Sequence, residues 1–528
     1  MVRKATANSP VGRQARKIAS AFAKGRMPSR TRELEALIDD GESVFETLDA
    51  LVAQLAVDDS DEGFLAQGYH FILCEQLEGL RFQRDRGYDL AIGMIENVQR
   101  AIAQHASAGR LTGAGLSMTT AALHHAGIPA SAELQTAIES SIAAEASTDP
   151  PSETEVAGLL EMIAEMCDGD PFLLIEQLAE AGHGMPVEAR ANMVVAMSAA
   201  GDATAREAAI LMLLDPAPAI RDAVLAALER GAHAISSVTL RRLIAMRNWV
   251  PADLRGRIDG IVRTARAGGV ECATWPAGSS DTIQASGFDG SGAQTALIVS
   301  SVGRRKCLTS MLFKRGLRDV WIGAPQSARE LASVLSKAGR EVVLMPVSHG
   351  YLDRIVCHGM QLALDAGVCP PVGLLQAAEL VGAAHWQPKR QDWRELLAAL
   401  VADIPASLTE PAAVIATLRK SDDWAALPGL ADSWFEDDQD VARIARRNSR
   451  AALEQQAAHL LQTVLEERRD RWAELFVWTA LWLREADDQP WQEFSILANA
   501  IANGHELDQI PVMWGIAANT VLAMATAA

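Results

Sequence analysis

Cysteine is scarce in this chain and is never closely paired. The 528 residues include six cysteines, and no two of them are closer than twelve positions. This spacing excludes zinc ribbons and knuckles, which need cysteines a few positions apart. Scattered thiols in a chain of this size are typical of reduced core residues in a cytoplasmic protein. We therefore expect a cytoplasmic location, no metal and no cofactor.

Long uninterrupted hydrophobic runs are also missing. No apolar segment of a signal peptide follows the basic N-terminus, so we expect none. Residues 510–528 carry no charge, which would suit a membrane anchor. However, a usable helix of about 14 residues spans only about 21 Å, less than the ~30 Å hydrocarbon core. We expect a buried terminal helix and no membrane partner.

Acidic side chains are absent from residues 1–32, although the net charge of the whole chain is −19. An acidic body repels nucleic acid unless a local basic patch overrides it. The 1–32 segment is such a candidate, since its cations could neutralise several phosphates; it could equally be a solvated extension. We expect a flexible basic arm. Its nine cations are Arg3, Lys4, Arg13, Arg16, Lys17, Lys24, Arg26, Arg30 and Arg32.

What the chain does contain is ordinary for a soluble globular protein: 49% hydrophobic and 22% charged residues. The length predicts about three or four units. From residue 31 onward, apolar residues recur at three- and four-residue spacing, which predicts amphipathic helices.

An internal repeat is the clearest pattern in the chain. Three segments each have a proline near the start and an arginine at the fifth position, and these arginines are 31 and 34 residues apart. A period of this length is typical of a helical solenoid, in which stacked helix pairs bury one another's faces. The segments are PVEARANMVVAM (186–197), APAIRDAVLAAL (217–228) and PADLRGRIDGIV (251–262), with arginines Arg190, Arg221 and Arg255.

The middle segment resembles the HEAT repeat, a unit of armadillo-type superhelices. In that family a first helix ends in an Asp-Pro turn, and a second helix opens with an Ile/Val-Arg pair. Asp215, Pro216, Ile220 and Arg221 match this pattern. Proline also sets the backbone angle at the opening of a helix. The resemblance covers about residues 152–266 and implies an interaction surface.

The composition changes after residue 270. Eleven of the twelve tryptophans lie beyond it, and residues 267–282 are rich in Gly, Pro and Ser, as in a linker. TALIVSS, KCLTSMLF and RDVWIG then predict strands. The whole chain is predicted to be mainly α, with a HEAT-like α-solenoid segment, a small α/β insert and a helical C-terminal domain. The expected parts are a basic arm (1–32), a helical region (33–150), HEAT-like repeats (151–268), an α/β unit (283–368) and C-terminal helices (369–528).

GFDGSGAQT, at 287–295 in the insert, invites comparison with a phosphate loop. A Walker loop needs four residues between its glycines and then Gly-Lys-Ser/Thr, which are missing. A dinucleotide fingerprint needs a third glycine and a following helix, whereas a strand is expected here. The sequence therefore predicts a turn before a strand.

Six cations lie within one stretch of fifteen residues, 304–318, in the same insert. Two hairpin turns could place them on one edge, where they would form an anion or RNA-backbone patch. Alternatively, they protect an exposed strand edge from aggregation. The six are Arg304, Arg305, Lys306, Lys314, Arg315 and Arg318.

No catalytic motif emerges. HELDQ (505–509) lacks the second histidine of a zincin, and no GxSxG is present. We expect a non-enzymatic protein-protein interaction or scaffold protein, because solenoids expose extended binding surfaces. One alternative is a nucleic-acid-associated protein using the 1–32 arm and the 304–318 cluster. The other is an enzyme with a site between the α/β unit and the C-terminal helices, marked by His349, His358 and carboxylates.

Overall fold

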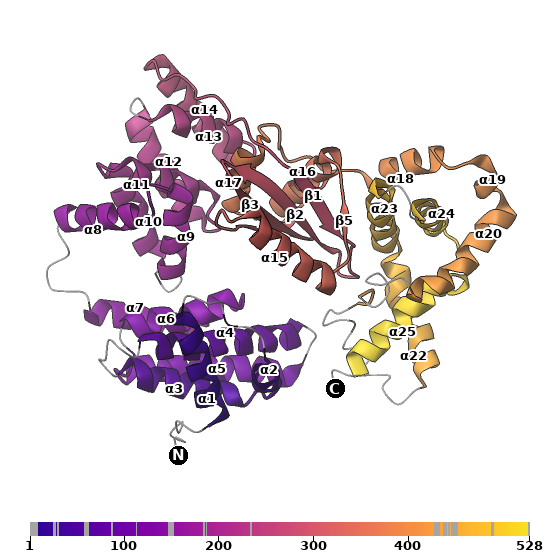
Figure 1. Cartoon of the computed structure of the whole chain (residues 1–528), viewed down its shortest axis with the longest axis horizontal. Coiled ribbons are helices and arrows are strands. Elements are labelled where there is room, and N and C mark those ends of the chain that lie inside the picture. The colour runs from indigo at the N-terminus through magenta and orange to yellow at the C-terminus, as the bar shows by residue number, and fades with distance from the viewer. Residues whose placement is uncertain are drawn as a thin grey trace. The chain divides into compact units, whose positions relative to one another are not determined.

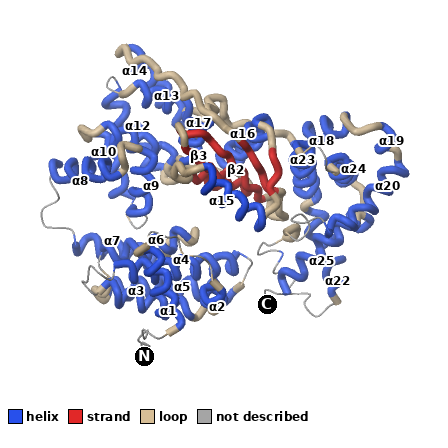
Figure 2. The backbone as a smooth tube through the Cα atoms, viewed as in Figure 1, coloured by secondary structure: helices blue, strands red, loops and turns tan. Residues whose placement is uncertain are grey.

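The chain is mainly helical, with one small sheet in its middle (Figures 1 and 2). The structure is a computed structural model of the 528-residue chain. It describes residues 9–24, 28, 31–56, 63–85, 88–111, 113–145, 153–182, 185, 187–232, 235–426, 433–436, 441, 444, 452–486 and 490–525.

The chain divides into two compact units, with the boundary between Ala205 and Arg206. This boundary falls inside the segment predicted as repeats, not at the expected linker 267–282, which lies within the second unit. The reason is that the last two helix pairs of that segment pack with the residues that follow the sheet.

In the first unit, the regular elements of the described residues are all helices. Its core runs from Val11 to Ile138, with α4 in contact with α1, α2, α3, α5 and α6. Its helices are α1 (Pro10–Phe22), α2 (Arg32–Asp39), α3 (Ser43–Leu55), α4 (Gly63–Asp85), α5 (Asp89–Ser107), α6 (Gly113–His125), α7 (Ala132–Glu145), α8 (Glu153–Met166), α9 (Pro171–Gly182) and α10 (Val187–Ala199).

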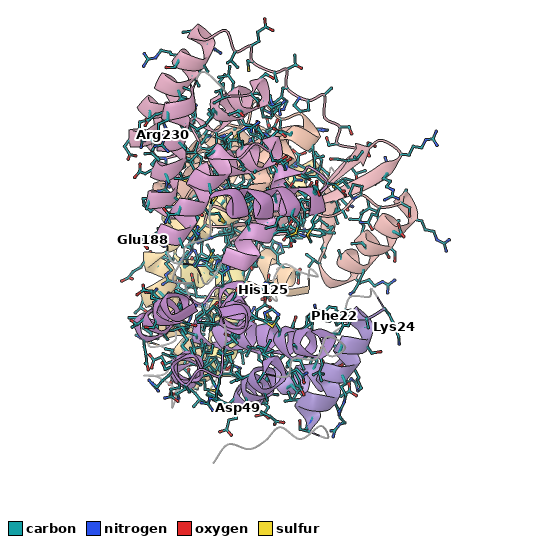
Figure 3. All side chains as sticks on the ribbon, turned by 90° about the vertical axis from the view of Figure 1, so that its left-hand side faces the viewer. Phe22, Lys24, Asp49, His125, Glu188 and Arg230 are labelled. Atoms are coloured by element: carbon teal, nitrogen blue, oxygen red, sulfur yellow. The ribbon has the colours of Figure 1, made fainter. Side chains whose placement is uncertain are left out.

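Part of the expected flexible arm is a packed helix. The Ser9 hydroxyl accepts a hydrogen bond from the Gly12 N–H and caps α1, and Val11, Ala15 and Ile18 are buried. At the end of α1, Phe22 (labelled in Figure 3) meets Phe71 of α4 edge-on, at 6.1 Å between ring centroids. The cations of α1 therefore lie on the exposed face of a helix whose opposite face is apolar and buried. Residues 1–8, 26 and 30 lie outside the described part of the chain.

The second unit opens with two helix pairs. They are α11 (Ala203–Leu211) with the 3₁₀ turn Met212–Leu214 and α12 (Pro218–Gly231), followed by α13 (Ser237–Met246) and α14 (Ala252–Ala267). As the repeated prolines predicted, α10, α12 and α14 each begin next to the proline of their segment.

A five-stranded sheet follows, in the order β4-β3-β2-β1-β5, with every pairing antiparallel. Strands β2, β3 and β4 were predicted; β1 was missed because it lies at the edge of the expected linker. The elements are β1 (Thr282–Ser286), β2 (Ala293–Val302), β3 (Arg305–Lys314), β4 (Leu317–Ile322), α15 (Ala328–Glu341), β5 (Leu344–Pro346), α16 (His349–Asp365) and α17 (Gly373–Val381).

The two faces of the sheet pack against different helices. Alternate side chains of a strand point to opposite faces. Leu297, Val299 and Leu308 pack with Leu331 of α15 on one face. Helices α16 and α17 pack against β4.

The C-terminal helices take up most of the tryptophan. Trp472 and Trp482 of α23 are buried, and Trp424 stacks on Phe494 at 3.9 Å between ring centroids. A π-helical turn at Leu461–Leu465 precedes α23, which begins at Arg469. The elements are α18 (Trp393–Ala402), α19 (Ala406–Thr409), α20 (Pro411–Lys420), a 3₁₀ turn (Ser421–Ala426), α22 (Leu453–Leu460), α23 (Arg469–Glu485), α24 (Trp491–Ala502), a 3₁₀ turn (Leu507–Gln509) and α25 (Pro511–Ala525).

The terminal helix is buried, as the sequence predicted: Met513, Ile516 and Ala517 of α25 are at most 1% exposed. Within the described residues, none of the helices combines the length and the apolar character needed to cross a membrane.

A substitution at Gly68 of α4 can test how closely α1 packs against α4. A Cβ at Gly68 would lie 2.4 Å from the backbone oxygen of Ala15, so only glycine lets the two helices approach this closely. We expect Gly68→Ala to lower the free energy of unfolding by about 1–3 kcal/mol and to speed trypsin cleavage at Arg13 and Arg16. Urea unfolding and timed proteolysis measure both.

Gly93→Ala in α5 is the matched control, because no atom lies within 4 Å of its added Cβ. It should leave cleavage unchanged and stabilise the helix by about 0.5–1 kcal/mol. Equal effects of the two substitutions would contradict close packing of α1.

Candidate functional site

The glycine-rich loop between β1 and β2 is a closed turn. The Asp289 carboxylate accepts hydrogen bonds from the Ser291 hydroxyl at 2.7 Å and the Ala293 N–H at 2.8 Å. The Gly292 N–H donates to the Asp289 carbonyl, and the Gly290 N–H to the Ser433 carbonyl, both at 2.9 Å. Because these glycine amides are bonded within the protein, they are not available to cradle a phosphate.

A buried carboxylate fixes this loop to the C-terminal helices. Glu436 is 2% exposed and accepts hydrogen bonds from Arg468, Arg471 and the Trp472 indole N–H. Arg471 also donates to the Gly290 carbonyl at 2.5 Å. A Cβ at Gly290 would lie 2.5 Å from the backbone nitrogen of Phe435, so glycine is required for this contact.

A pocket of about 280 Å³ lies beside this junction. The loop after β1, the turn between β3 and β4, α16 and α23 all contribute to its lining. Phe288, Phe313 and Trp478 give it an aromatic wall, and Arg315, Arg390 and Arg471 are its cations. Pockets of this kind, apolar with a few convergent polar groups, are typical of small-molecule sites.

His358 is a neutral polar group in this pocket. Its Nδ1 accepts a hydrogen bond from the Gln391 N–H at 3.0 Å, so Nε2 carries the proton. Its ring lies 5.0 Å from that of Trp478, between centroids. Burial is the main reason why the pKa of His358 falls from 6.5 to about 4, with a further lowering from Arg390. At neutral pH the residue therefore offers a hydrogen-bond donor without a charge.

Glu474 is the acidic group in the lining. Burial raises the pKa of its carboxyl above the usual 4.5, although a hydrogen bond from Trp478 opposes this shift. Both residues lie on α23, four positions apart, which places them on one face of the helix.

The basic cluster predicted from the sequence does not form one patch. Consecutive hairpins in an antiparallel sheet turn at opposite ends of the shared strand, which is why the expectation of one edge was wrong. Arg304 and Arg305 lie in the turn that enters β3, and Lys314, Arg315 and Arg318 in and after the turn that leaves it. The two turns are about 30 Å apart along the ten residues of β3.

The cations of this cluster also differ in the groups with which they form ion pairs or hydrogen bonds. Lys306 pairs with Asp281 at 2.7 Å, Arg305 donates to the Pro325 carbonyl at 3.3 Å, and Arg318 donates to the Lys314 carbonyl at 2.8 Å. Only Arg315 reaches the pocket. The ammonium group of Lys306 thus forms an ion pair within the sheet.

None of the three repeat arginines lines this pocket, and two of them, Arg221 and Arg255, bond to their own turns. Arg221 is 6% exposed and donates from Nη1 to the carbonyls of Asp215, at 2.6 Å, and Pro216, at 2.9 Å. Ile220 beside it is fully buried. Arg255 reaches back in the same way, to the Val250 carbonyl at 3.4 Å. Arg190 lies in α10 of the first unit.

The histidines expected to mark an enzyme site do not converge. His349 hydrogen-bonds Ser280 at the start of α16, nine residues and about 14 Å along the helix from His358. His124 and His125 lie at the end of α6. No group of three or more His, Cys, Asp or Glu side chains in the described part of the chain could hold a metal ion. Sequence reasoning missed Arg390, Arg471 and Glu474, since nothing local distinguishes them from surface charges.

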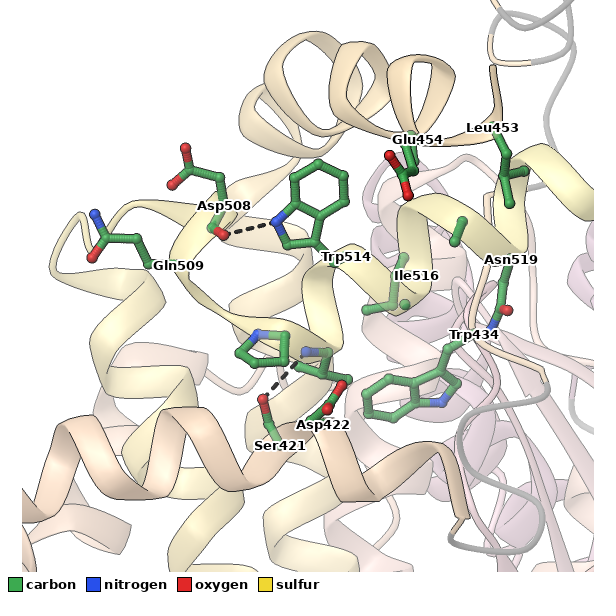
Figure 4. A pocket seen from close by; sticks show the side chains of 15 residues that line it. Ser421, Asp422, Trp434, Leu453, Glu454, Asp508, Gln509, Trp514, Ile516 and Asn519 are labelled. Atoms are coloured by element: carbon green, nitrogen blue, oxygen red, sulfur yellow. Dashed lines mark hydrogen bonds between the residues drawn. The ribbon is translucent and has the colours of Figure 1, made fainter.

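A second cavity, of about 490 Å³, lies among the C-terminal helices (Figure 4). Within it the Trp514 indole donates to the Asp508 carbonyl at 2.7 Å, and the Val512 N–H to the Ser421 hydroxyl at 3.2 Å. No cation and no histidine is among the described residues that line it. The charged side chains in its lining are all acidic: Asp422, Glu454 and Asp508.

Comparison with known proteins identifies two segments of this chain. Residues 376–525 match the Y4lR C-terminal helical domain, and residues 186–269 match the Y4lR second domain. The chain is similar to y4lR over most of its length. That uncharacterized protein of Sinorhizobium fredii (strain NBRC 101917 / NGR234) is 26% identical over 493 residues, which cover 90% of this chain and 91% of the relative. No solved structure matches.

The positions of these matches can be compared with the parts of the chain that the sequence predicted. The model that matches at 186–269 is the Y4lR second domain and not a HEAT repeat. The sheet lies between the two matched segments, while Arg390, Arg471, Glu474 and Trp478 fall in the Y4lR C-terminal helical domain. The matched C-terminal helical domain thus holds five of the sixteen residues that line the pocket, and its description states no function.

The lowered pKa of His358 predicts a pH dependence of stability. Between about pH 6.5 and pH 4 the unfolded chain binds a proton at His358 and the folded chain does not, so the free energy of unfolding falls as pH drops. The full shift is worth about 3 kcal/mol. His358→Gln should lose this part of the slope in urea unfolding measured across that range.

His459→Gln is the control, because it removes an exposed imidazole instead of a buried one. Parallel pH profiles for the wild type and His358→Gln would show that His358 is not held neutral by the fold.

Proposed function

We propose that this chain is a non-enzymatic protein-interaction protein, with the HEAT-like helices of residues 151–268 as its binding surface. The single observation that carries the proposal is the equivalence of Arg221 and Arg255. Each lies near the start of the second helix of a pair and donates to carbonyls five to seven residues earlier. An arginine that closes each turn in the same way is expected of a repeating unit.

The stacking of the two pairs supports the same proposal. Arg242 of α13 pairs with Glu207 of α11 at 3.0 Å, which joins the first helices. Arg257 of α14 pairs with Glu229 at 2.7 Å and Asp222 at 2.8 Å, both in α12, which joins the second helices. First helix on first helix and second on second is the arrangement of a solenoid, in which each unit contacts its neighbours.

The partner that fits best is another protein, because exposed apolar side chains gather in the preceding helices. Met166 is 76% exposed and Met162 is 52% exposed, both on α8. Methionine is flexible and polarizable, and it is common on surfaces that adapt to a partner. The other exposed apolar residues between α8 and α10 are Leu173, Met185, Val187 and Val195.

Nucleic acid receives less support as a partner. Its proposed contacts were the 1–32 arm and the 304–318 cluster, but α1 is packed on α4 and the cluster is divided between two ends of β3. Two separate groups of cations neutralise fewer neighbouring phosphates than one continuous patch.

The turn-closing arginines give a first prediction. Arg221→Met leaves two carbonyls without a charged donor, and we expect it to lower the free energy of unfolding by about 1.5–3 kcal/mol. Arg255→Met should cost less, under about 1 kcal/mol, because its contacts are long. Urea unfolding measures both, with the exposed Arg230→Met of the same helix α12 as control (Figure 3). Equal effects of Arg221→Met and Arg230→Met would contradict the closing role.

The binding surface gives a second prediction. Purified wild-type protein should retain a partner from extracts of its own cells, and the double variant Met162→Glu/Met166→Glu should retain at least about tenfold less. The matched control is Val334→Glu/Val343→Glu, which adds the same charges at exposed positions near the sheet.

This control should retain as much partner as the wild type, and all three proteins should have the same melting temperature. If the methionine variant retains its partner fully, or if the wild type retains none, the proposed surface is wrong.

A further inference from the structure

The pocket beside the sheet can accommodate an apolar ligand group about the size of one ring. Trp478 lies 5.0 Å from His358 and 6.4 Å from Phe288, between ring centroids, so three rings line one side. The volume of about 280 Å³ is near the lower limit for small-molecule sites. A flat or aliphatic ligand group that displaces water from these rings would bury the most apolar surface.

Arg315 is the cation that the fold does not explain. It occupies the first central position of the two-residue turn between β3 and β4, with φ of 51°, and Gly316 follows with φ of 125°. A turn with two positive φ values favours Asn, Asp or Gly at that position, and a bulky side chain there is strained. Among the described residues, Arg315 has no ion-pair or side-chain hydrogen-bond partner, yet it lines the pocket. Residues held in such conformations gather at ligand sites.

The other two arginines of the pocket are not equivalent. Arg471 is committed to Glu436 and to the Gly290 carbonyl. Arg390 has one contact, to Asp365 at 3.3 Å, and most of its five N–H donors remain available. Arg315 is therefore free to bind an anion, and the N–H groups of Arg390 that do not contact Asp365 can donate to the same anion.

The neighbouring groups favour a carboxylate over a phosphate. The amides of Gly290 and Gly292 are bonded to protein carbonyls, so the loop offers no cradle of N–H groups. Glu474 in the lining repels a doubly charged anion more than a singly charged one. The planar fork of a guanidinium matches the two oxygens of a carboxylate, and the His358 Nε2–H adds a neutral donor.

From this geometry we propose that the pocket binds a small organic carboxylate with an apolar body. Arg315 and Arg390 hold the carboxylate, and the body lies against Trp478 and Phe288. This site is independent of the protein-interaction surface on the helix pairs, because it uses the sheet turns and the C-terminal helices.

Matched pairs of probes test the charge. Full-length protein is titrated calorimetrically with benzoate, naphthalene-2-acetate and octanoate, and with the amide of each acid; inorganic phosphate is a further competitor. We expect at least one carboxylate to bind with a dissociation constant below about 1 mM, at least tenfold tighter than its amide, and phosphate not to displace it.

Arg315→Gln and Arg304→Gln form the matched pair of variants. Both remove one charge from a turn of β3, but only Arg315 lines the pocket. Arg315→Gln should weaken carboxylate binding at least about tenfold, and Arg304→Gln less than about twofold. Both side chains are exposed, and equal melting temperatures confirm that the variants fold.

Three results would overturn the proposal: no carboxylate of the series binds, an amide binds as tightly as its acid, or the two arginine variants weaken binding equally. Displacement by phosphate at equal concentration would replace the carboxylate with a phosphate ligand and would contradict the proposed class.

Discussion

The buried carboxylate of Glu436 is the contact on which the second unit depends most. An isolated charge in a protein interior is strongly unfavourable, so it must be paired and hydrogen-bonded. Arg468 and Arg471 supply the opposite charges, and the Trp472 indole adds a third donor. Arg471 then reaches the Gly290 carbonyl, which carries the constraint from the C-terminal helices to the sheet. The pocket exists because this junction holds the loop after β1 against α23.

Indole N–H groups extend the same junction. Trp434 donates to the Phe288 carbonyl at 2.7 Å and Trp482 to the Ala285 carbonyl at 3.0 Å, each across more than 140 residues of chain. A tryptophan buries a large apolar surface and still satisfies a carbonyl at its polar edge. Two of the tryptophans after residue 270 thus join the helical C-terminal part to the segment that begins the sheet.

Helices and strands were predicted well where the pattern was local. The proline at 218 and the periodicity after it predicted α12, and alternating residues predicted β2 and β3. Two errors have a common origin. Strand β1 was not predicted, and the cations around β3 were placed on one edge. Both depend on the pairing partner and turn direction of a strand, which its own residues do not record.

The sequence by itself determined which segments form helices, which side chains they bury, and that Arg221 and Arg255 occupy equivalent positions. These properties follow from periodicity and from turn residues a few positions apart. Only the tertiary structure decided that Arg315, His358 and Trp478 line one pocket. A buried face in a sequence shows that something covers it, but the covering element is chosen by packing across the whole unit, over distances in the chain that no local pattern spans.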